Sequence, residues 1–528
     1  MRLAQAVRWG LPLMGVSVAI TPPPKLARTR TGGPSRTVSS DTTPLWRFNA
    51  TSDITAFTLG PEGASVLYVL TKNGVLCLDA ATGAQRWGRD DLPFVPPAGF
   101  ALTYGAHGAP PSPIRGLALG EQRMEILDLL TGDKVSESSA WSVDAPRGFL
   151  PLTGPDLFLL VAKTGRSKRA LLGVAPEKGD VRWRPDSAFE RDPEFWQVPT
   201  GRRRLAYEIT TSTLFGNQLP IVDTDSTAIL YISKDGPTKI HLLTGAVLWR
   251  AQALRGKDVP VRGDGYASLL QAGGVLYVPV EKSLQALGAD DGRARWDPAP
   301  SFPGRVTQME LTALGLLVRG AEPDREGRLR DNRFVALVDP STGIARWSGP
   351  PLELEHTTPF VVRGDTAYLA TERTLVAVSL VDGSSRDVAS FQLEGGQAPW
   401  EVEVRDDGFL LLASHNLLLV DRSGSQVYHR SYKPPGTGVF AVLGSIFLNK
   451  PLRRAVTGFS ERHVYVVTQS PDSSGRKGLS LVRVEKANGA EAGRIWLSGK
   501  PADYEVDPGT GTVYLQTGNR EIIAARFP

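Results

Sequence analysis

Short apolar runs alternate with turn-forming residues along almost the whole chain after residue 44. In the clearest copy, the apolar runs Val66–Val69 and Gly74–Leu78 are followed by the turn Asp79-Ala-Ala-Thr-Gly83 and then by Trp87. Short apolar runs bounded by Gly, Asp and Asn are typical of β-strands. The pattern therefore predicts an all-β chain.

The same order of strand, strand, turn and tryptophan returns many times. The clear copies contain Asp79, Gly83 and Trp87; Gly245 and Trp249; Asp290, Gly292 and Trp296; and Asp339, Gly343 and Trp347. Weaker copies have turns at Asp128–Gly132, Glu177–Gly179, Asp382–Gly383, Asp421–Gly424 and Ala487–Gly489, and a truncated unit occupies residues 511–525. A repeat of roughly 40 to 50 residues with four short strands is typical of a propeller blade. We therefore expect a single β-propeller of about eight to ten four-stranded units.

The repeated turn residues have a structural explanation. An Asp at the start of a turn accepts hydrogen bonds from backbone N–H groups, and a Gly supplies the positive φ that a tight turn needs. A Trp on the next strand can pack between neighbouring sheets. We therefore assign these residues to blade assembly and not to catalysis.

The two ends of the repeat region are complementary. Pro44–Phe48 resembles an outer strand with no blade before it, and the last unit stops before its own outer strand. We expect these ends to pair and close the propeller, because pairing removes two exposed sheet edges. Two longer intervals predict insertions near residues 185–225 and 430–460. An alternative count treats one or two weak units, in residues 100–200 or 430–500, as embellishments of a smaller ring.

Residues 1–44 differ in composition from the repeats. Two arginines precede the short apolar stretch Trp9–Val18, and small residues follow it, an order typical of a secretory signal peptide. We interpret residues 1–19 as a possible signal peptide and residues 20–44, rich in Pro, Thr, Ser and Arg, as a disordered tether. The protein is then periplasmic or secreted, and it is cytoplasmic if the segment is not a signal. We expect no transmembrane segment, because no apolar stretch is long enough to cross a bilayer.

The charge distribution argues against a nucleic-acid partner. The formal net charge is +5, but the first 40 residues hold six Lys and Arg residues and no acidic residue. The repeat region is therefore nearly neutral, whereas a nucleic-acid-binding domain normally carries a basic face. We expect no nucleic-acid partner.

The unit Asp79-Ala-Ala-Thr-Gly83-x-x-x-Trp87, with the strand Val66–Val69 before it, resembles the repeat of PQQ-like propellers. That family includes quinoprotein alcohol dehydrogenases and BamB-type periplasmic assembly factors, so the resemblance implies a fold and leaves the function open. Quinoprotein dehydrogenases characteristically have two adjacent, disulfide-bonded cysteines over the cofactor and a calcium ion beside a catalytic Asp. This chain departs from that pattern, because Cys77 is its only cysteine. The departure weakens the enzyme hypothesis.

Candidate site residues are few. The six histidines lack metal-ligand spacing, and the pairs Asp223/Asp225, Asp290/Asp291 and Asp406/Asp407 are more typical of solvated turns than of calcium sites. We therefore predict no catalytic, cofactor-binding or metal-binding residue, and no cofactor. Aromatic and basic residues in the first predicted insertion form a candidate partner-binding loop, which contains Phe195, Trp196, Arg202, Arg203, Arg204 and Tyr207.

These observations favour a non-catalytic propeller that acts as a protein-binding or scaffolding module of the cell envelope or of a larger assembly. The expected partner is another protein or an envelope polymer. The alternative is a quinone-dependent oxidoreductase of the alcohol or aldose dehydrogenase type. That activity requires a stacking platform, a divalent metal and a positioned base, and the sequence contains no set of residues that must perform those tasks.

Overall fold

A computed structural model describes most of the chain. The described ranges are 43–60, 65–92, 99–102, 115–119, 124–141, 145–152, 157–164, 168–175, 177–184, 221–222, 227–233, 236–254, 269–323, 329–349, 352–353, 358–413, 416–433, 456–457, 462–471, 477–497, 501–507 and 509–527. They belong to one compact unit, Val38–Pro528, and the other unit, Met1–Thr37, lies outside them. The ordered structure in these ranges is β-strand, apart from short 3₁₀ helices at η2 (Ser138–Trp141), η4 (Gln252–Leu254) and η5 (Glu394–Gly396).

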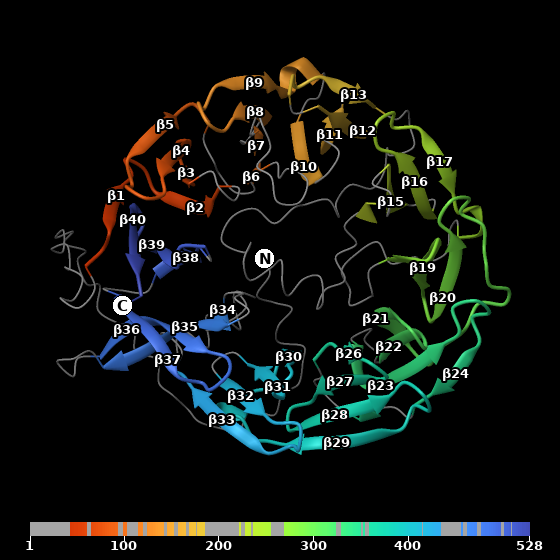
Figure 1. Cartoon of the computed structure of the whole chain (residues 1–528). Helices are drawn as coiled ribbons and strands as arrows, with labels where there is room; N and C mark the ends of the chain where they lie inside the picture. The colour runs from red at the N-terminus through yellow and green to blue at the C-terminus, as the bar shows by residue number, and fades with distance from the viewer. Residues whose placement is uncertain are drawn as a thin grey trace, which may run out of the picture. The chain divides into compact units, whose positions relative to one another are not determined.

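The described strands form ten antiparallel sheets, which follow one another in chain order (Figure 1). We call them blades 1 to 10. Blades 1 to 3 consist of β2 (Ile54–Leu59), β3 (Val66–Thr71), β4 (Val75–Asp79) and β5 (Gln85–Arg89); of β6 (Gly99–Leu102), β7 (Arg115–Leu119), β8 (Met124–Asp128) and β9 (Lys134–Glu137); and of β10 (Ala145–Leu152), β11 (Leu157–Thr164), β12 (Lys168–Val174) and β13 (Val181–Trp183).

The central blades are blades 4 to 7. They consist of β14 (Ile221–Val222), β15 (Ala228–Ser233), β16 (Gly236–His241) and β17 (Val247–Arg250); of β18 (Leu270–Ala272), β19 (Val275–Val280) and β20 (Ser283–Gly288); of β21 (Arg305–Thr312), β22 (Gly315–Pro323), β23 (Leu329–Val338) and β24 (Ala345–Ser348), with β25 (Leu352–Glu353) also paired to β23; and of β26 (Val361–Arg363), β27 (Thr366–Ala370), β28 (Thr374–Ser379) and β29 (Ser385–Ser390).

The last blades are blades 8 to 10. They consist of β30 (Glu401–Val404), β31 (Phe409–Leu412), β32 (Asn416–Val420) and β33 (Gln426–Ser431); of β34 (Val456–Thr457), β35 (His463–Pro471), β36 (Lys477–Glu485) and β37 (Glu491–Leu497); and of β38 (Pro501–Val506), β39 (Thr512–Thr517), β40 (Glu521–Arg526) and β1 (Trp46–Asn49).

The middle strands of a blade are apolar at nearly every position because both of their faces are buried. In β3, Leu67 and Val69 pack in a core with Tyr514 of blade 10. The alternate residue Tyr68 packs in a second core with Leu127 of blade 2. Successive side chains of a strand point to opposite faces, so one strand contributes to two cores. A continuous apolar run is what such a strand requires.

Neighbouring blades share apolar cores over much of the described chain, and blade 10 packs on blade 1. Shared apolar cores join blade 1 to blade 2, blades 4 to 8 in succession, and blades 8, 9 and 10. Closure is completed by β1, which pairs with β40 in the register Trp46↔Ala524 to Asn49↔Glu521. The predicted propeller and its closure by the N-terminal strand are therefore confirmed.

The ten blades are not a uniform set of four-stranded sheets. The weak units in residues 100–200 and 430–500 are blades and not embellishments, since they form β6–β9, β10–β13 and β34–β37. Blade 5 has three regular strands, and the segment after β20 pairs with it only through the bridges Leu287↔Ala294 and Ser283↔Ser301. The insertions predicted near residues 185–225 and 430–460 lie largely outside the described residues and stay predictions; the flanking strands are β14, which begins at Ile221, β33, which ends at Ser431, and β34, which begins at Val456. No helix in the described ranges is long and apolar enough to cross a membrane.

Candidate functional site

The repeated turn holds its Asp carboxylate in a fixed set of bonds. In blade 1, Asp79 Oδ1 accepts the backbone N–H groups of Ala81 and Thr82, at 3.1 and 2.9 Å. Its Oδ2 accepts the Arg86 guanidinium at 2.6 Å, and this bond is the largest cause that lowers the pKa of Asp79 to about 2. The following Gly83 has a φ of +73°. The carboxylate is therefore committed to the turn.

One turn carboxylate is not the residue expected from the sequence. In blade 5, the oxygen that accepts the backbone N–H of Arg293 belongs to Asp291, at 3.0 Å, and not to Asp290. Gly288 occupies the position that Asp79 has in blade 1, so the acceptor moves to the residue directly before the turn glycine. Blade 7 has the same arrangement, with Asp382 bonded to the N–H of Ser384 at 3.0 Å.

The repeated tryptophans join neighbouring blades. Each donates its indole N–H to a backbone carbonyl in the turn of the next blade, and its ring lies on the positive-φ glycine of that turn. We call this contact the tryptophan clasp. The bonds run from Trp87 to Leu129, Trp249 to Ala289, Trp296 to Pro340 and Trp347 to Leu380, at 3.0, 3.0, 3.1 and 2.9 Å. A Cβ on the turn glycine would lie between 2.5 and 2.8 Å from the ring in each case.

Other residues take the role of the tryptophan where it is missing. Trp141 in η2 donates to the carbonyl of Gly179 at 2.7 Å and so joins blade 2 to blade 3. Tyr428 donates its hydroxyl to the carbonyl of Lys486 at 2.7 Å and joins blade 8 to blade 9. Sequence analysis missed both contacts, because Trp141 does not follow its turn glycine at the usual distance and Tyr428 is not a tryptophan. The aromatic residues of the repeat are thus engaged between blades.

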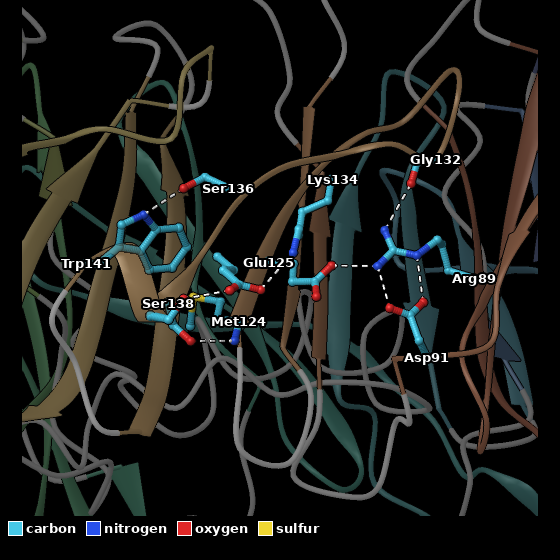
Figure 2. Close-up of polar contacts among 11 residues, drawn as sticks. Arg89, Asp91, Met124, Glu125, Gly132, Lys134, Ser136, Ser138 and Trp141 are labelled. Atoms are coloured by element: carbon cyan, nitrogen blue, oxygen red, sulfur yellow. Dashed lines mark hydrogen bonds and ion pairs between the residues drawn. The ribbon is translucent and has the colours of Figure 1, made fainter.

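A buried ion pair adds a polar link between blades 1 and 2 (Figure 2). Glu125 lies on β8 with a side chain only 1% exposed, and its Oε2 is 2.9 Å from the guanidinium of Arg89. Arg89 also bonds Asp91 at 2.7 Å and the carbonyl of Gly132 at 3.2 Å. These carboxylates, Asp91 first, raise the pKa of Arg89. A buried carboxylate needs such a partner, and its bond to a guanidinium indicates a structural role.

A second polar link joins blades 8 and 9. Lys486, in the turn of blade 9, bonds Glu403 of β30 at 2.6 Å. Glu403 also bonds Arg405 at 3.2 Å, and Arg405 bonds Asp407 at 2.9 Å. These groups neutralise one another and hold two blades together.

Two of the acidic pairs considered as calcium ligands lie within the described residues, and in each of them at least one carboxylate bonds an arginine. Asp291 bonds Arg295 at 3.2 Å, Asp406 bonds Arg363 at 2.5 Å, and Asp407 bonds Arg405. Asp223 and Asp225 lie outside the described residues. Within the described ranges no three His, Cys, Asp or Glu residues gather in a way that could hold a metal ion.

The single cysteine and the described histidines have local surroundings of their own. Cys77 is buried, and its burial raises the pKa of the thiol to about 12. His241 begins the turn of blade 4, where its Nδ1 is 3.3 Å from the backbone nitrogen of Thr244. His429 Nε2 is 2.9 Å from Asn416 Oδ1. These residues belong to separate places in the fold.

The predicted partner-binding loop falls outside the described residues. This holds for all six of its members: Phe195, Trp196, Arg202, Arg203, Arg204 and Tyr207. The described chain stops at Arg184, directly after Trp183, and Trp183 bonds the carbonyl of Leu242 in the turn of blade 4. Trp183, near the end of this described range, therefore lies beside the turn of blade 4.

That turn carries an exposed apolar group which sequence analysis missed. Leu243, Val247 and Leu248 are 54%, 37% and 49% exposed, and we call them the apolar corner. In blades 1 and 6 the turn Asp bonds an Arg seven residues later, at 2.6 and 2.7 Å. Blade 4 has His241 and Leu248 at these two positions. The absence of this Asp and Arg pair from blade 4 is the feature of the sequence that could have indicated the exposed apolar group.

Comparison with protein families agrees with this geometry. Residues 238–433 match the family model described as outer membrane protein assembly factor BamB. Over these residues the β-propeller is PQQ-like. The matched region begins within β16 and ends just after β33, so it spans four complete blades and part of blade 4.

Solved structures similar to the PQQ-like propeller are diverse. BamB from Moraxella catarrhalis is 13% identical, with 72% of this chain and 96% of that chain covered and a TM-score of 0.36. The WD40 domain of SCAP from fission yeast is 7% identical, with coverages of 92% and 97% and a TM-score of 0.35. The quinohemoprotein alcohol dehydrogenase ADHIIG from Pseudomonas putida HK5 is 11% identical, with coverages of 78% and 82% and a TM-score of 0.31. Likeness at this level carries no argument about function. No curated protein matches the chain.

Proposed function

We propose that this PQQ-like propeller is a non-catalytic binding or scaffolding protein of the cell envelope, periplasmic or secreted, whose partner is another protein or an envelope polymer. The observation that carries the proposal is the match of residues 238–433 to a family described as an outer membrane assembly factor. The same fold supports both catalysts and binding modules, so the site must support the choice.

The residues of the repeat support a binding function. The turn carboxylates bond backbone N–H groups and arginines, and the tryptophans bond the neighbouring blade. The residue types that a quinone enzyme would use for stacking and metal binding thus have another explanation here. No described residue specifically favours the alternative of a quinone-dependent oxidoreductase.

The binding surface is proposed to combine two segments. One is the predicted loop with Trp196 and Arg203, which lies between blades 3 and 4 in the sequence, and the other is the apolar corner of Leu243, Val247 and Leu248. Exposed apolar groups bordered by polar residues are typical of protein interfaces. Trp and Arg are also the residues most enriched at interface centres.

Affinity capture from the native envelope fraction tests the proposal. We expect the wild-type protein to retain a partner, and the variants Trp196→Ala/Arg203→Ala and Leu243→Ser/Leu248→Ser to lose it. The control Ile344→Ser/Val381→Ser removes two side chains that are equally aliphatic and each 68% exposed, on blades 6 and 7. Partner retention by both test variants would contradict the assigned surface, and the absence of any captured partner would contradict the binding function.

A further inference from the structure

The tryptophan clasp links the blades in an unbroken series from blade 10 through blade 1 to blade 7. Trp46 of blade 10 donates its indole N–H to the carbonyl of Ala80 in blade 1 at 3.0 Å. Its ring lies on Gly83, where a Cβ would come within 2.6 Å of it. The clasps already described then join blades 1 to 7 in succession, with Trp141 and Trp183 on either side of blade 3. We call these eight blades the clasped arc.

Blade 7 has no aromatic residue at the clasp position of its fourth strand. In blades 1, 4, 5 and 6 the tryptophan comes four residues after the turn glycine, whereas four residues after Gly383 is the exposed Asp387. The turn glycine of blade 8, Gly424, lies on backbone instead of on a ring, since a Cβ there would be 2.1 Å from the carbonyl oxygen of Val388. Phe391, directly after β29, packs on the core of this boundary but has no hydrogen-bond donor in its side chain. Blade 7 therefore sends no clasp to blade 8.

Blade 9 also has no side chain at its clasp position. Four residues after Gly489 the chain has Gly493. Phe527 of blade 10 lies over this glycine, with its Cβ 2.9 Å from the point that a Cβ of Gly493 would occupy. The Phe527 ring is 5.7 Å from the ring of Tyr465, and the guanidinium of Arg483 lies 4.9 Å from its centre. Ring packing thus takes the place of the clasp between blades 9 and 10.

The tryptophan of β37 faces away from blade 10. Ile495 and Leu497 pack in the core that blade 9 shares with blade 10. Successive side chains of a strand point to opposite faces, so Trp496, between these two residues, faces the other side. Trp496 therefore cannot replace the missing clasp.

Blades 8 and 9 are joined to each other by several buried or half-buried polar contacts. Besides the bond of Tyr428 to Lys486 and the ion pair of Lys486 with Glu403, the guanidinium of Arg430 donates to the carbonyl of Gly489 at 2.8 Å. The backbone N–H of Gln469 in β35 donates to the carbonyl of Lys433, just after β33, at 2.9 Å. We call blades 8 and 9 the bonded pair.

Apolar packing does not distinguish the two ends of the bonded pair from the other boundaries. Shared apolar cores lie between blades 7 and 8 and between blades 9 and 10, as they do within the clasped arc. The difference lies in the polar contacts. Arg363 and Asp406 form an ion pair across the boundary of blades 7 and 8, but their side chains are 47% and 94% exposed. Exposed ion pairs contribute little, whereas loss of a buried hydrogen bond leaves an unsatisfied polar group.

We infer that the bonded pair is one cooperative unit, which opens locally while the clasped arc stays intact. Proteins open in cooperative units whose limits follow the weaker internal boundaries. Here the limits are the two boundaries without a clasp, and the contacts of Tyr428, Arg430 and Lys486 make blades 8 and 9 open together. Opening uncovers apolar residues on the flanking blades, such as Leu375 of blade 7 and Leu515 of blade 10, which pack in the cores shared with the pair.

Native-state hydrogen exchange of the full-length protein, measured by mass spectrometry at low urea concentrations, tests this inference. We compare β32 and β36 of the bonded pair with β20 and β23 of the clasped arc. We expect the amides of β32 and β36 to exchange at least tenfold faster than those of β20 and β23, with one common dependence on urea. Equal exchange in all four strands, or different urea dependences for β32 and β36, would overturn the inference.

Two matched variants test whether blades 8 and 9 open together. Tyr428→Phe keeps the ring and removes the hydroxyl that bonds Lys486, while Trp296→Phe removes the indole donor to Pro340 within the clasped arc. We expect Tyr428→Phe to speed exchange several-fold in both β32 and β36 and to leave β20 and β23 unchanged. Trp296→Phe should have the reverse effect. Faster exchange confined to blade 8, or spread over all four strands, in Tyr428→Phe would refute the assigned unit.

Discussion

A methyl group added to a turn glycine tests whether the tryptophan clasp holds the blades together. Gly343, in the turn of blade 6, has a φ of +76°, and a Cβ there would lie 2.8 Å from the ring of Trp296. Gly364 also has a positive φ, of +65°, but a Cβ there would meet nothing within 4 Å. The substitutions Gly343→Ala and Gly364→Ala therefore share the backbone effect and differ only in the clasp.

The contacts of Gly343 set the expected difference in unfolding free energy between the two variants. Both variants force alanine into the left-handed region, which costs about 1–2 kcal/mol. In Gly343→Ala, normal carbon contacts of about 3.5–4.0 Å require the Trp296 ring to move by roughly 1 Å. Such overpacking costs about 1–3 kcal/mol. The displaced indole also weakens its 3.1 Å bond to Pro340, worth about 1 kcal/mol. We expect Gly343→Ala to lose about 2–4 kcal/mol more unfolding free energy than Gly364→Ala.

Urea unfolding followed by circular dichroism measures this difference without relying on the fluorescence of Trp296 itself. The midpoints give the change in unfolding free energy when the slopes agree. We expect a clearly lower midpoint for Gly343→Ala. Equal midpoints for the two variants would refute the conclusion that the glycine is needed under the indole.

Four further predictions follow from the same contacts. Deletion of residues 41–50 should sharply lower the melting temperature because it removes β1, whereas deletion of residues 21–36 should change it little; equal melting temperatures would contradict closure by β1. The pKa of Asp79 is lowered to about 2, so the stabilisation it gives is complete above the unfolded value near 3.8 and is lost as the pH falls toward 2. Asp79→Asn should therefore flatten the decline of the melting temperature between about pH 4 and 2, and a profile identical to wild type would exclude this role. Arg89→Ala leaves Glu125 buried without its guanidinium and should cost about 3–5 kcal/mol in urea unfolding, against less than about 1 for the exposed Lys72→Ala. Incubation with PQQ and calcium should give neither quinone absorbance after gel filtration nor oxidation of alcohols or aldoses, and stoichiometric PQQ retention with dye-linked dehydrogenase activity would overturn the non-catalytic function.

The fold was predictable because every blade needs the same few residue types at neighbouring positions of its own sequence. The two-faced burial of β3 needs an unbroken apolar run. Each blade also needs a turn glycine, which receives the ring from the blade before, and a tryptophan four residues later, which reaches the blade after, as at Gly83 and Trp87. These requirements leave visible marks in the sequence. The unmatched strand around Trp46 likewise indicated closure before any contact was known.

Contacts that depend on tertiary geometry were not predictable. Trp141 joins blades 2 and 3 from η2, which places its indole near Gly179 although its position in the sequence is irregular. The buried pair of Arg89 and Glu125 joins residues on different blades, and no local pattern marks them. Leu248 directly precedes the buried Trp249 in an apolar run, so the strand pattern did not indicate its exposure, and only the comparison with Arg86 and Arg346 at the same position of other blades could have done so. The candidate loop with Trp196 stays a prediction.

Blade 10 takes its fourth strand, β1, from the other end of the repeat region and not from a turn after β40, and this origin bears on how the chain can be rearranged. Because each clasp reaches only the next blade, the contacts depend on the cyclic order of the blades and not on where the polypeptide opens. A linker with the sequence of the turn Asp79–Gln85 would join Phe527 to Leu45, and new ends could then be cut in the turn of another blade. Such circular permutants would keep every neighbour relation between blades and would move the strand that closes the propeller to the chosen blade.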